Sequence, residues 1–279
     1  MIVSGKARLA GVLGWPVSHS RSPRLHGFWL EKLGIDGAYL PLAVAPENLE
    51  SVICALPRMG FAGANVTVPH KEAVMRLVDR LDPLAARIGA VNTLVVGEDG
   101  ALEGRNTDSY GFFQNLRQGC PGWVPSSGPA AVIGAGGAAR AVVAALADAG
   151  VPEIRLANRS RERAEALAAD LGGPVRVVEW AERADMLENC ALLVNTTTLG
   201  MTGQSNLDLD LSALPQTALV NDIVYVPLET DLLARARARG NQVVDGLGML
   251  LHQAVPGFAA WFGRRPEVTE ELRSFVLSS

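Results

Sequence analysis

What the 279-residue sequence lacks excludes several classes of protein. It holds 25 Lys and Arg against 29 Asp and Glu, so it has no basic excess of the kind that binds nucleic acid. Its three cysteines lie far apart without CxxC spacing, and its four histidines form no HxxxH or HExxH pattern. We therefore expect no disulfide framework, no bound metal and a reducing, cytoplasmic environment.

Long apolar runs are also missing. No stretch of 18 apolar residues occurs, which predicts that no helix spans a membrane. The run at residues 9–17 imitates the centre of a signal peptide, but Gly11, Gly14 and Pro16 interrupt it and no A-x-A cleavage site follows. We interpret this run as a buried first strand, with a signal peptide as the less favoured alternative.

Short apolar runs alternate with helical patterns along the chain, which predicts an α/β fold of mostly parallel sheets with helices on both faces. A hairpin is expected at residues 90–106 and a short helix at 71–79. A Pro/Gly/Ser-rich linker at 121–129 precedes a second strand–helix series. We predict one domain at residues 1–107 and a second, Rossmann-type domain at 108–245, with the helices of 246–279 packing back on the first.

The sequence "AVIGAGGAAR" predicts a dinucleotide-binding turn. An apolar strand leads directly into a G-x-G-x-x-A pattern, and an alanine-rich helix follows. The first glycine permits the tight turn, the second permits close approach of a pyrophosphate, and the helix N-terminus offers free N–H groups. The residues expected to contact the cofactor are Gly134, Ala135, Gly136, Gly137 and Ala138. The alternative is a plain glycine-rich turn.

The segment "LANRSRERAEAL" bears on which dinucleotide binds. NAD-binding domains place Asp or Glu at the end of the second strand, where it accepts from the ribose 2′-hydroxyl. This chain has no acid there and offers instead Asn158, Arg159, Ser160 and Arg163. A planar guanidinium grips a 2′-phosphate, so the segment favours NADP. The alternative, a solvated helix face of ion pairs, suits the neighbouring Arg161, Glu162 and Glu165.

Polar side chains flank the strands of the first domain. They stand in "WPVSHSRSP", "NVTVPHK", "AVNTL" and "NTDSYG", beside apolar runs, where open α/β sheets bind ligands. Hydroxyl and amide groups suit a polyhydroxylated ligand, and Lys71 with Asp108 suits proton transfer. Each residue alone has an ordinary alternative as a cap or turn residue. Four such clusters together indicate the substrate site of a hydride-transfer enzyme.

These motifs, with "GAGGAAR", "NRS" and "GLGMLLHQA", follow the order found in shikimate dehydrogenases, and the chain resembles that family over nearly its whole length. The resemblance implies reversible reduction of 3-dehydroshikimate to shikimate with NADPH, in chorismate and aromatic amino acid biosynthesis. It implies a small-molecule substrate as partner. The oligomeric state is left open, with a homodimer as one alternative.

The resemblance also implies roles for single residues. Lys71 would exchange the proton and Asp108 would be its catalytic partner. The residues that would contact the substrate are Ser20, Ser22, Thr67, Asn92, Asp108, Tyr225 and Gln253. Gly246 and Met249 would lie near the nicotinamide, and the adenosine 2′-phosphate would be held by Asn158, Arg159, Ser160 and Arg163. No role is implied for His70.

Two positions depart from the family's usual pattern. Ser109 stands where a glycine usually follows the NTD aspartate, and we expect its side chain to alter the hinge between domains or to crowd Asp108. Thr196 replaces the alanine of a usual N-A-T segment. Two rival functions remain: a quinate/shikimate dehydrogenase, often NAD-dependent, and a non-catalytic NADP-binding regulator. The acid-free strand end opposes the first rival, and the retained Lys71 and Asp108 oppose the second.

Overall fold

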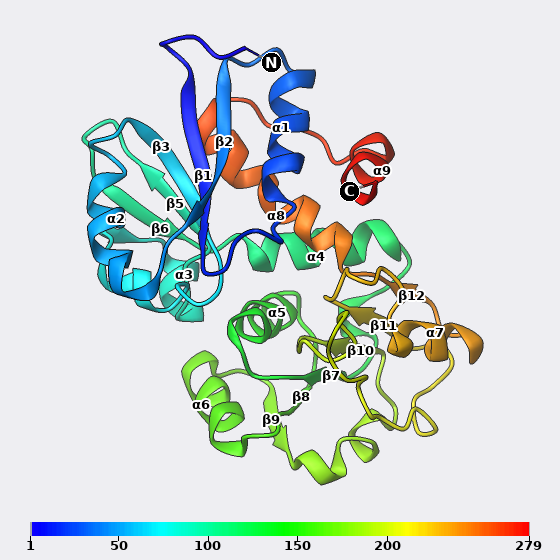
Figure 1. The fold of residues 1–279 in the computed structure, drawn as a ribbon. Helices are drawn as coiled ribbons and strands as arrows, with labels where there is room; N and C mark the ends of the chain where they lie inside the picture. The colour runs from blue at the N-terminus through cyan, green and yellow to red at the C-terminus, as the bar shows by residue number, and fades with distance from the viewer. Residues whose placement is uncertain (1, 279) are drawn as a thin grey trace. The chain divides into compact units, whose positions relative to one another are not determined.

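The computed structural model describes residues 2–278 and divides the chain into two compact units. The first unit comprises residues up to Thr107 together with those from Leu250 onward, and the second comprises Asp108–Met249 (Figure 1). Each unit is built on a six-stranded sheet in its described part. The α/β fold class expected from the alternation of strand and helix patterns is confirmed.

The sheet of the first unit is mixed, with the strand order β2–β1–β3–β5–β6–β4. Its strands are β1 (Arg8–Gly14), β2 (Gly37–Ala43), β3 (Phe61–Val66), β4 (Arg80–Leu81), β5 (Thr93–Val96) and β6 (Leu102–Arg105). β1, β2 and β3 are parallel, whereas β5 runs antiparallel to both β3 and β6. The β5–β6 pair is the expected hairpin. Because β5 is reversed, its amino end lies beside the carboxyl ends of β1, β3 and β6.

The helices before residue 107 are short. They are α1 (Ser22–Lys32), α2 (Leu49–Ala55) and α3 (Pro83–Ile88), with 3-10 turns at Pro46–Asn48 and Ala73–Arg76. The prediction of a helix at 71–79 is wrong, because this range contains only the 3-10 turn at Ala73–Arg76. Val74 is the one buried residue of that turn, and so short a segment needs tertiary packing to remain helical. Lys71 therefore does not stand at the N-terminus of an α-helix.

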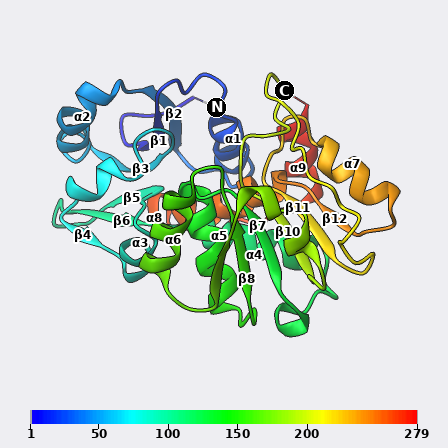
Figure 2. The same cartoon turned by 90° about the horizontal axis from the view of Figure 1, so that it is seen from below.

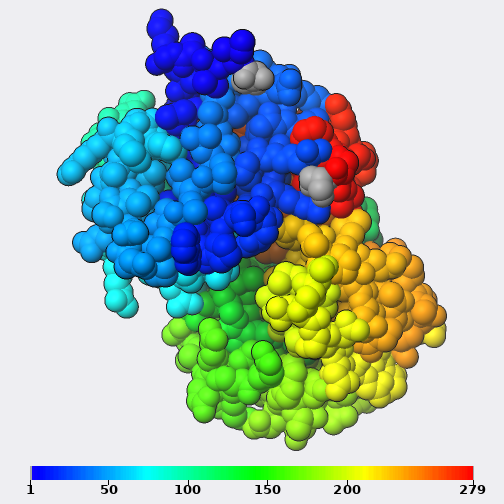
Figure 3. All heavy atoms as spheres, in the orientation of Figure 1, coloured from blue at the N-terminus to red at the C-terminus, as the bar shows by residue number. Residues whose placement is uncertain are grey.

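The last two helices of the described chain are α8 (Leu247–Phe262), whose first residues belong to the second unit, and α9 (Glu270–Leu277). The buried Trp261 holds α8 on the first sheet, because its ring nitrogen donates to the Leu94 carbonyl at 2.8 Å. A Cβ on Gly63 would lie 2.3 Å from that nitrogen, so only glycine fits there. α9 lies beside α1 (Figure 3, red and blue), where Arg24 Nε donates to the Phe275 carbonyl at 2.8 Å.

The second unit has an all-parallel sheet of order β12–β11–β10–β7–β8–β9. Figure 2 labels its strands from β12 to β8. Its strands are β7 (Ala130–Ile133), β8 (Ile154–Ala157), β9 (Val175–Val178), β10 (Leu192–Asn195), β11 (Leu219–Asp222) and β12 (Val243–Val244). Its helices are α4 (Asp108–Gly119), α5 (Gly137–Asp148), α6 (Arg161–Leu171) and α7 (Asp231–Ala238), with 3-10 turns at Pro125–Ser127, Trp180–Glu182 and Asp185–Leu187.

Apolar residues cover both faces of this second sheet. Val132 of β7 packs in one buried cluster with α4, α5 and α6, whereas its neighbour Ile133 packs in another with α7. Successive strand residues point to opposite faces, so a strand buried on both sides reads as a continuous apolar run. In residues 2–278, no helix is both long and apolar enough to cross a lipid bilayer.

An aromatic cage surrounds His26 in the first unit. Its ring stacks on Tyr39 with 3.9 Å between centroids, and the rings of Trp29, Phe258 and Trp261 lie 5.6–5.8 Å away. The side chain is wholly buried, and neither ring nitrogen has a hydrogen-bond partner in the described chain. Burial lowers the pKa of His26 to about 3, because a charged imidazolium would lose its hydration; the nearby Asn65 side chain opposes this effect.

We expect His26 to make the fold less stable as the pH falls from the ordinary histidine pKa of 6.5 toward about 3. In this window the unfolded chain binds a proton and the folded chain does not, so the loss is on the order of 2–3 kcal/mol between pH ~7.5 and pH ~4.5. His26→Phe should remove this part of the dependence in urea unfolding. His19→Gln, at an exposed histidine, should retain it. Identical pH dependence in wild type and His26→Phe would contradict a neutral His26.

Candidate active site

One edge of the first sheet gathers the residues expected at the substrate. It is formed by the carboxyl ends of β1, β3 and β6 and the amino end of β5. The segments after β1 and β3 are joined by a hydrogen bond from the Trp15 N–H to the Val68 carbonyl, 3.1 Å. From these segments and from the β5–β6 hairpin come Ser20, Ser22, Thr67, Lys71 and Asn92.

Ser20 and Ser22 lie together where α1 begins. The Ser22 N–H donates to Ser20 Oγ at 3.3 Å, and Ser22 is the first residue of the helix. Ser22 is buried and Ser20 is half-buried. The first turn of a helix carries partial positive charge and unpaired N–H groups, so this pair of hydroxyls suits an anionic group of a ligand.

Asn92 stands at the centre of this edge. Its side-chain oxygen accepts from the Thr107 N–H at 2.8 Å and from the Thr93 hydroxyl at 2.9 Å. Its Nδ2 donates to Thr107 Oγ1 at 3.0 Å and lies 3.4 Å from Gln253 Oε1 on α8. Asn92 and Gln253 are only 2% and 8% exposed. The fold thus brings together two residues that are 161 positions apart in the chain.

The backbones of Lys71 and Asp108 are attached to the neighbours of Asn92. The Val91 N–H donates to the Lys71 carbonyl at 2.8 Å, and Val91 directly precedes Asn92. Thr107, which binds the Asn92 side chain, directly precedes Asp108. Lys71 is half-buried, and Asp108 is buried at the start of α4.

Ser109, the first departure from the expected pattern, belongs to a helix contact inside the second unit. Its hydroxyl donates to the Ala141 carbonyl at 2.8 Å, which joins α4 to α5. The side chain is buried, and this bond pairs the hydroxyl inside the unit.

The glycine-rich turn joins β7 to α5 as the sequence pattern predicts. Gly134 has φ +110, and a Cβ there would lie 2.6 Å from Thr196 Oγ1, so glycine is needed for both conformation and space. Gly136 has φ −90, and a Cβ there would meet no protein atom within 4 Å. The space in front of Gly136 and the free N–H groups of α5 therefore fit a bound pyrophosphate. Ala139 is wholly buried, which permits close helix–strand packing.

Thr196, the second departure, closes the other side of this turn. Its hydroxyl donates to the Ile133 carbonyl at 2.7 Å, directly before Gly134. The preceding Asn195 accepts from the Thr197 N–H and donates to Asp222, at 3.0 Å each. Burial raises the pKa of Asp222, although its hydrogen bonds with Val224, Thr230 and Asn195 oppose the shift.

Sequence reasoning missed this group of buried polar residues. Their one signal is the presence of polar letters inside the apolar runs "LLVNTT" and "LVNDIV".

The end of β8 carries no carboxylate, which fits a 2′-phosphate. Arg159 and Arg163 are exposed, and their side chains make no hydrogen bond or ion pair within residues 2–278. Arg161, in contrast, pairs with Glu165 and Glu179, as the ion-pair alternative predicts. The Asn158 side chain donates to the Ser160 carbonyl at 2.8 Å, which shapes the turn before α6. The Ser160 hydroxyl donates to Glu162 at 2.9 Å and would have to turn to reach a ligand.

Three further expected residues follow β11 and β12 in the chain. Tyr225 follows β11 and is half-buried, and Met249 is buried in the first turn of α8. A Cβ on Gly246 would lie 2.1 Å from the Ile223 carbonyl oxygen, so this glycine is required by the close approach of two backbone segments. Packing inside the second unit therefore explains Gly246 without a ligand.

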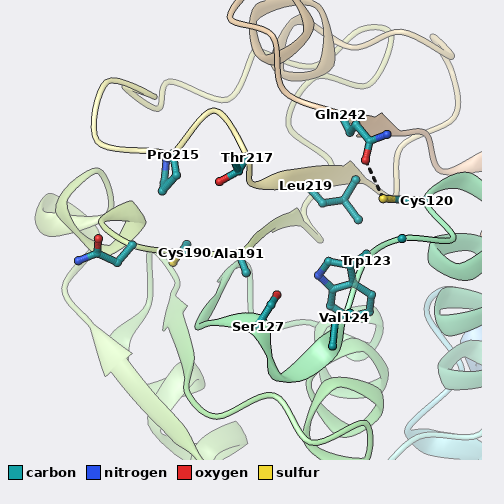
Figure 4. Close-up of a pocket in the computed structure, with 12 residues that line it drawn as sticks. Cys120, Trp123, Val124, Ser127, Cys190, Ala191, Pro215, Thr217, Leu219 and Gln242 are labelled. Atoms are coloured by element: carbon teal, nitrogen blue, oxygen red, sulfur yellow. Dashed lines mark hydrogen bonds between the residues drawn. The ribbon is translucent and has the colours of Figure 1, made fainter.

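A hollow in the second unit lies at the opposite edge of its sheet. A cavity of about 510 Å³ opens at the amino ends of β7, β10 and β11, among residues that include Trp123, Ser127, Cys190 and Thr217 (Figure 4). The Cys120 thiol donates to Gln242 Oε1 at 2.8 Å beside it. Ligands of parallel sheets bind at the carboxyl ends of strands, so this cavity is separate from the candidate site.

Family models match most of the chain. The shikimate dehydrogenase substrate binding domain matches residues 12–94, shikimate / quinate 5-dehydrogenase matches residues 126–202, and the shikimate 5'-dehydrogenase C-terminal domain matches residues 246–270.

Individual relatives agree with these models. A protein of Paramagnetospirillum magneticum named shikimate dehydrogenase (NADP(+)) is 86% identical over 99% of this chain and 100% of its own. Among solved structures, a Thermus thermophilus shikimate 5-dehydrogenase in complex with NADP(H) and shikimate is 39% identical, with a TM-score of 0.87 over 97% of this chain and 99% of its own. A Corynebacterium glutamicum quinate dehydrogenase in complex with NAD is 32% identical, with a TM-score of 0.91 over 98% and 99%.

The two glycines of the turn are expected to respond differently to alanine. Gly134→Ala should lower the thermal unfolding temperature, because a side chain at φ +110 is strained by about 1–2 kcal/mol and also meets Thr196. Gly136→Ala should leave unfolding within about 0.5 kcal/mol of wild type but weaken NADP binding at least ~10-fold, since its methyl group enters open space needed by the phosphates. Calorimetric unfolding and NADP titration measure both effects; unchanged NADP affinity in Gly136→Ala would show that no phosphate approaches there.

Proposed function

We propose that this chain, which belongs to the shikimate dehydrogenase family, carries out that family's reaction with Lys71 and Asp108 as its catalytic pair. The reaction is the reversible, NADPH-dependent reduction of 3-dehydroshikimate to shikimate in chorismate and aromatic amino acid biosynthesis, so the chain is an oxidoreductase. The observation that carries this conclusion is 86% identity, over 99% of the chain, to a protein named shikimate dehydrogenase (NADP(+)).

The division of labour between domains follows the same proposal. Residues 1–107 bind the substrate, residues 108–245 bind NADP, and the helices of 246–279 serve the substrate domain. The substrate contacts are assigned to Ser20, Ser22, Thr67, Asn92, Asp108, Tyr225 and Gln253. The hydroxyls of Ser20 and Ser22 at the start of α1 suit the substrate carboxylate, and the amides of Asn92 and Gln253 suit ring hydroxyls.

Proton transfer is the chemical task assigned to Lys71 and Asp108. Bound NADPH supplies a hydride to the substrate ketone. Lys71 donates a proton to the oxygen that becomes the new hydroxyl, and its ammonium stabilises negative charge there. Asp108 orients the Lys71 ammonium and contacts a ring hydroxyl. The attachment of both backbones to the neighbours of Asn92 supports this arrangement, because it fixes the starting points of the two side chains.

The cofactor contacts are assigned to the glycine turn, residues 134–138, and to Asn158, Arg159, Ser160 and Arg163. Gly246 and Met249 are assigned to the nicotinamide side. The open space at Gly136 and the unpaired Arg159 support these assignments. Ser160 supports them less, because Glu162 already accepts its hydroxyl hydrogen.

Quinate is the second candidate substrate, because a quinate dehydrogenase in complex with NAD shares this fold with a TM-score of 0.91. The absence of an acid at the end of β8 favours NADP and therefore shikimate. Steady-state rates with shikimate and quinate, each with NADP and NAD, distinguish the two. A cytoplasmic location and a homodimer stay predictions, the first supported by cysteines without disulfide spacing, and light scattering would test the second.

Lys71→Ala is expected to lower turnover with shikimate by about 10³-fold, because the proton donor and its charge are lost together. NADP affinity should stay within about twofold of wild type. NADPH absorbance measures turnover and calorimetric titration measures NADP binding. Lys6→Ala, at an exposed lysine before β1, is the matched control and should behave as wild type. Near-normal turnover in Lys71→Ala would remove Lys71 from the mechanism.

Arg159→Ala is expected to raise the KM for NADPH at least ~10-fold and to leave the KM for NADH nearly unchanged, because only NADPH carries a 2′-phosphate for the guanidinium. Arg161→Ala is the matched control two residues away, since Arg161 is already paired with Glu165 and Glu179. Equal effects of Arg159→Ala on both cofactors would contradict a phosphate contact.

A further inference from the structure

A directional chain of hydrogen bonds leads to Asn92 from the interior of the first unit. We propose that Tyr39, Asn65 and Thr93 are positioning residues that hold the Asn92 amide with its N–H group toward the substrate. The inference rests on the proposed function, because that function assigns Asn92 to a ring hydroxyl. The direction of each bond follows from groups whose roles are fixed.

The first fixed group is the Thr107 N–H, which can only donate. It lies 2.8 Å from the Asn92 side-chain oxygen, so the oxygen and not the nitrogen of the amide faces inward. The Thr93 hydroxyl adds a second bond to the same oxygen at 2.9 Å. The Thr107 hydroxyl also donates to this oxygen at 3.2 Å, so the oxygen is used inside the fold, and Asn92 faces a ligand with its Nδ2, which also donates to Thr107 Oγ1 at 3.0 Å.

The second fixed group is the Asn92 backbone carbonyl, which can only accept. Asn65 Nδ2 lies 3.2 Å from it and 3.2 Å from Thr93 Oγ1, so the nitrogen of the Asn65 amide faces β5. Thr93 therefore accepts from Asn65, and we assign its single hydrogen to Asn92 Oδ1 at 2.9 Å because Thr107 Oγ1 lies farther away, at 3.3 Å. The Asn65 oxygen is left to accept from the Tyr39 hydroxyl at 2.6 Å.

We call the chain of hydrogen bonds from Tyr39 through Asn65 and Thr93 to Asn92 the relay, and Tyr39 is its inner end. It is 7% exposed and stacks on the neutral His26 at 3.9 Å, which restrains the ring that carries the donating hydroxyl. Burial raises the pKa of Tyr39 well above its usual value, so the hydroxyl keeps its proton at every working pH. Asn65 and Thr93 are 5% and 1% exposed, so solvent does not compete for these bonds.

The outer end of the relay defines what a ligand group must offer. The Leu250 carbonyl accepts from Gln253 Nε2 at 3.0 Å, so Gln253 Oε1 is the end of that amide that faces Asn92 Nδ2. Asn92 then presents a donor and Gln253 an acceptor, 3.4 Å apart. A hydroxyl satisfies both at once, because it accepts from Asn92 and donates to Gln253, whereas a ketone or ether oxygen satisfies only Asn92. The relay thus selects a hydroxyl at this position of the ring.

Thr93→Val tests the relay, because it removes the hydroxyl and keeps the branched shape. We expect its KM for shikimate to rise about 5- to 10-fold, the loss of roughly one hydrogen bond, with a smaller change in kcat. NADP affinity should be unchanged. Thr93→Ser keeps the hydroxyl and should return KM to within about twofold of wild type. A KM in Thr93→Val equal to that of Thr93→Ser would overturn the proposal.

Tyr39→Phe is the independent second variant and decides the question where Thr93→Val fails to fold. It leaves the Asn65 oxygen unpaired, so KM for shikimate should rise several-fold while NADP affinity is retained. An unchanged KM in this variant also overturns the relay.

Asn92→Asp tests whether Asn92 donates a hydrogen bond to the substrate. It is nearly isosteric but presents an oxygen where Nδ2 stood, so KM should rise at least ~100-fold; a wild-type KM would contradict donation by Asn92. Asn92→Ala separates the two proposals. If it leaves KM unchanged, the assignment of Asn92 to the substrate fails, whereas an impaired Asn92→Ala beside a normal Thr93→Val defeats the relay alone.

Discussion

The hydrogen bond from the Thr107 N–H to the Asn92 side-chain oxygen is the constraint on which the polar edge of the first unit depends. A backbone N–H only donates, so this contact decides which end of the amide turns inward. It also joins the segment after β6 to the residue before β5, and Asp108 follows at once in the chain. One backbone group thus orients an amide assigned to the substrate and sets the starting point of the carboxylate assigned to catalysis.

In the second unit, a hydrogen bond between a side chain and the backbone likewise holds the glycine turn. Thr196 donates to the Ile133 carbonyl and fills the space beside Gly134, so the turn is held from both the strand before it and the loop after β10. That loop is ordered in turn by Asn195 and the buried Asp222. Asp222 is an uncommon residue for a strand end buried on both faces, and its three donors offset the cost of burying a carboxylate.

Local patterns in the sequence predict much of this fold, because strand–helix alternation, the hairpin and the glycine turn depend on neighbouring residues. The exceptions depend on partners far along the chain. From the sequence alone, Ser109 is expected to alter a hinge, whereas in the structure it donates to the Ala141 carbonyl of α5. Thr196 is an unusual loop residue in the sequence, and the structure shows that it packs against Gly134. The expected helix at 71–79 fails for the related reason that burial, and not propensity, decides so short a segment. Tyr39 gave no signal as a site residue, since it reads as an ordinary strand residue, whereas Thr93 belongs to the polar cluster "AVNTL" but no role was assigned to it.

A buried polar network is a demanding way to hold a side chain. Apolar isosteres at Asn65 and Thr93 would avoid desolvating an amide and a hydroxyl, and replacing both partners of a buried hydrogen bond is often nearly neutral for stability. Apolar packing would fix the position of the Asn92 side chain but not the direction of its amide, because oxygen and nitrogen have nearly the same size. Only partners with a fixed hydrogen-bonding role distinguish them, and the chain from Tyr39 to Asn92 supplies such partners at each step. The polar interior of the first unit is therefore better explained by the orientation it imposes on a ligand contact than by stability.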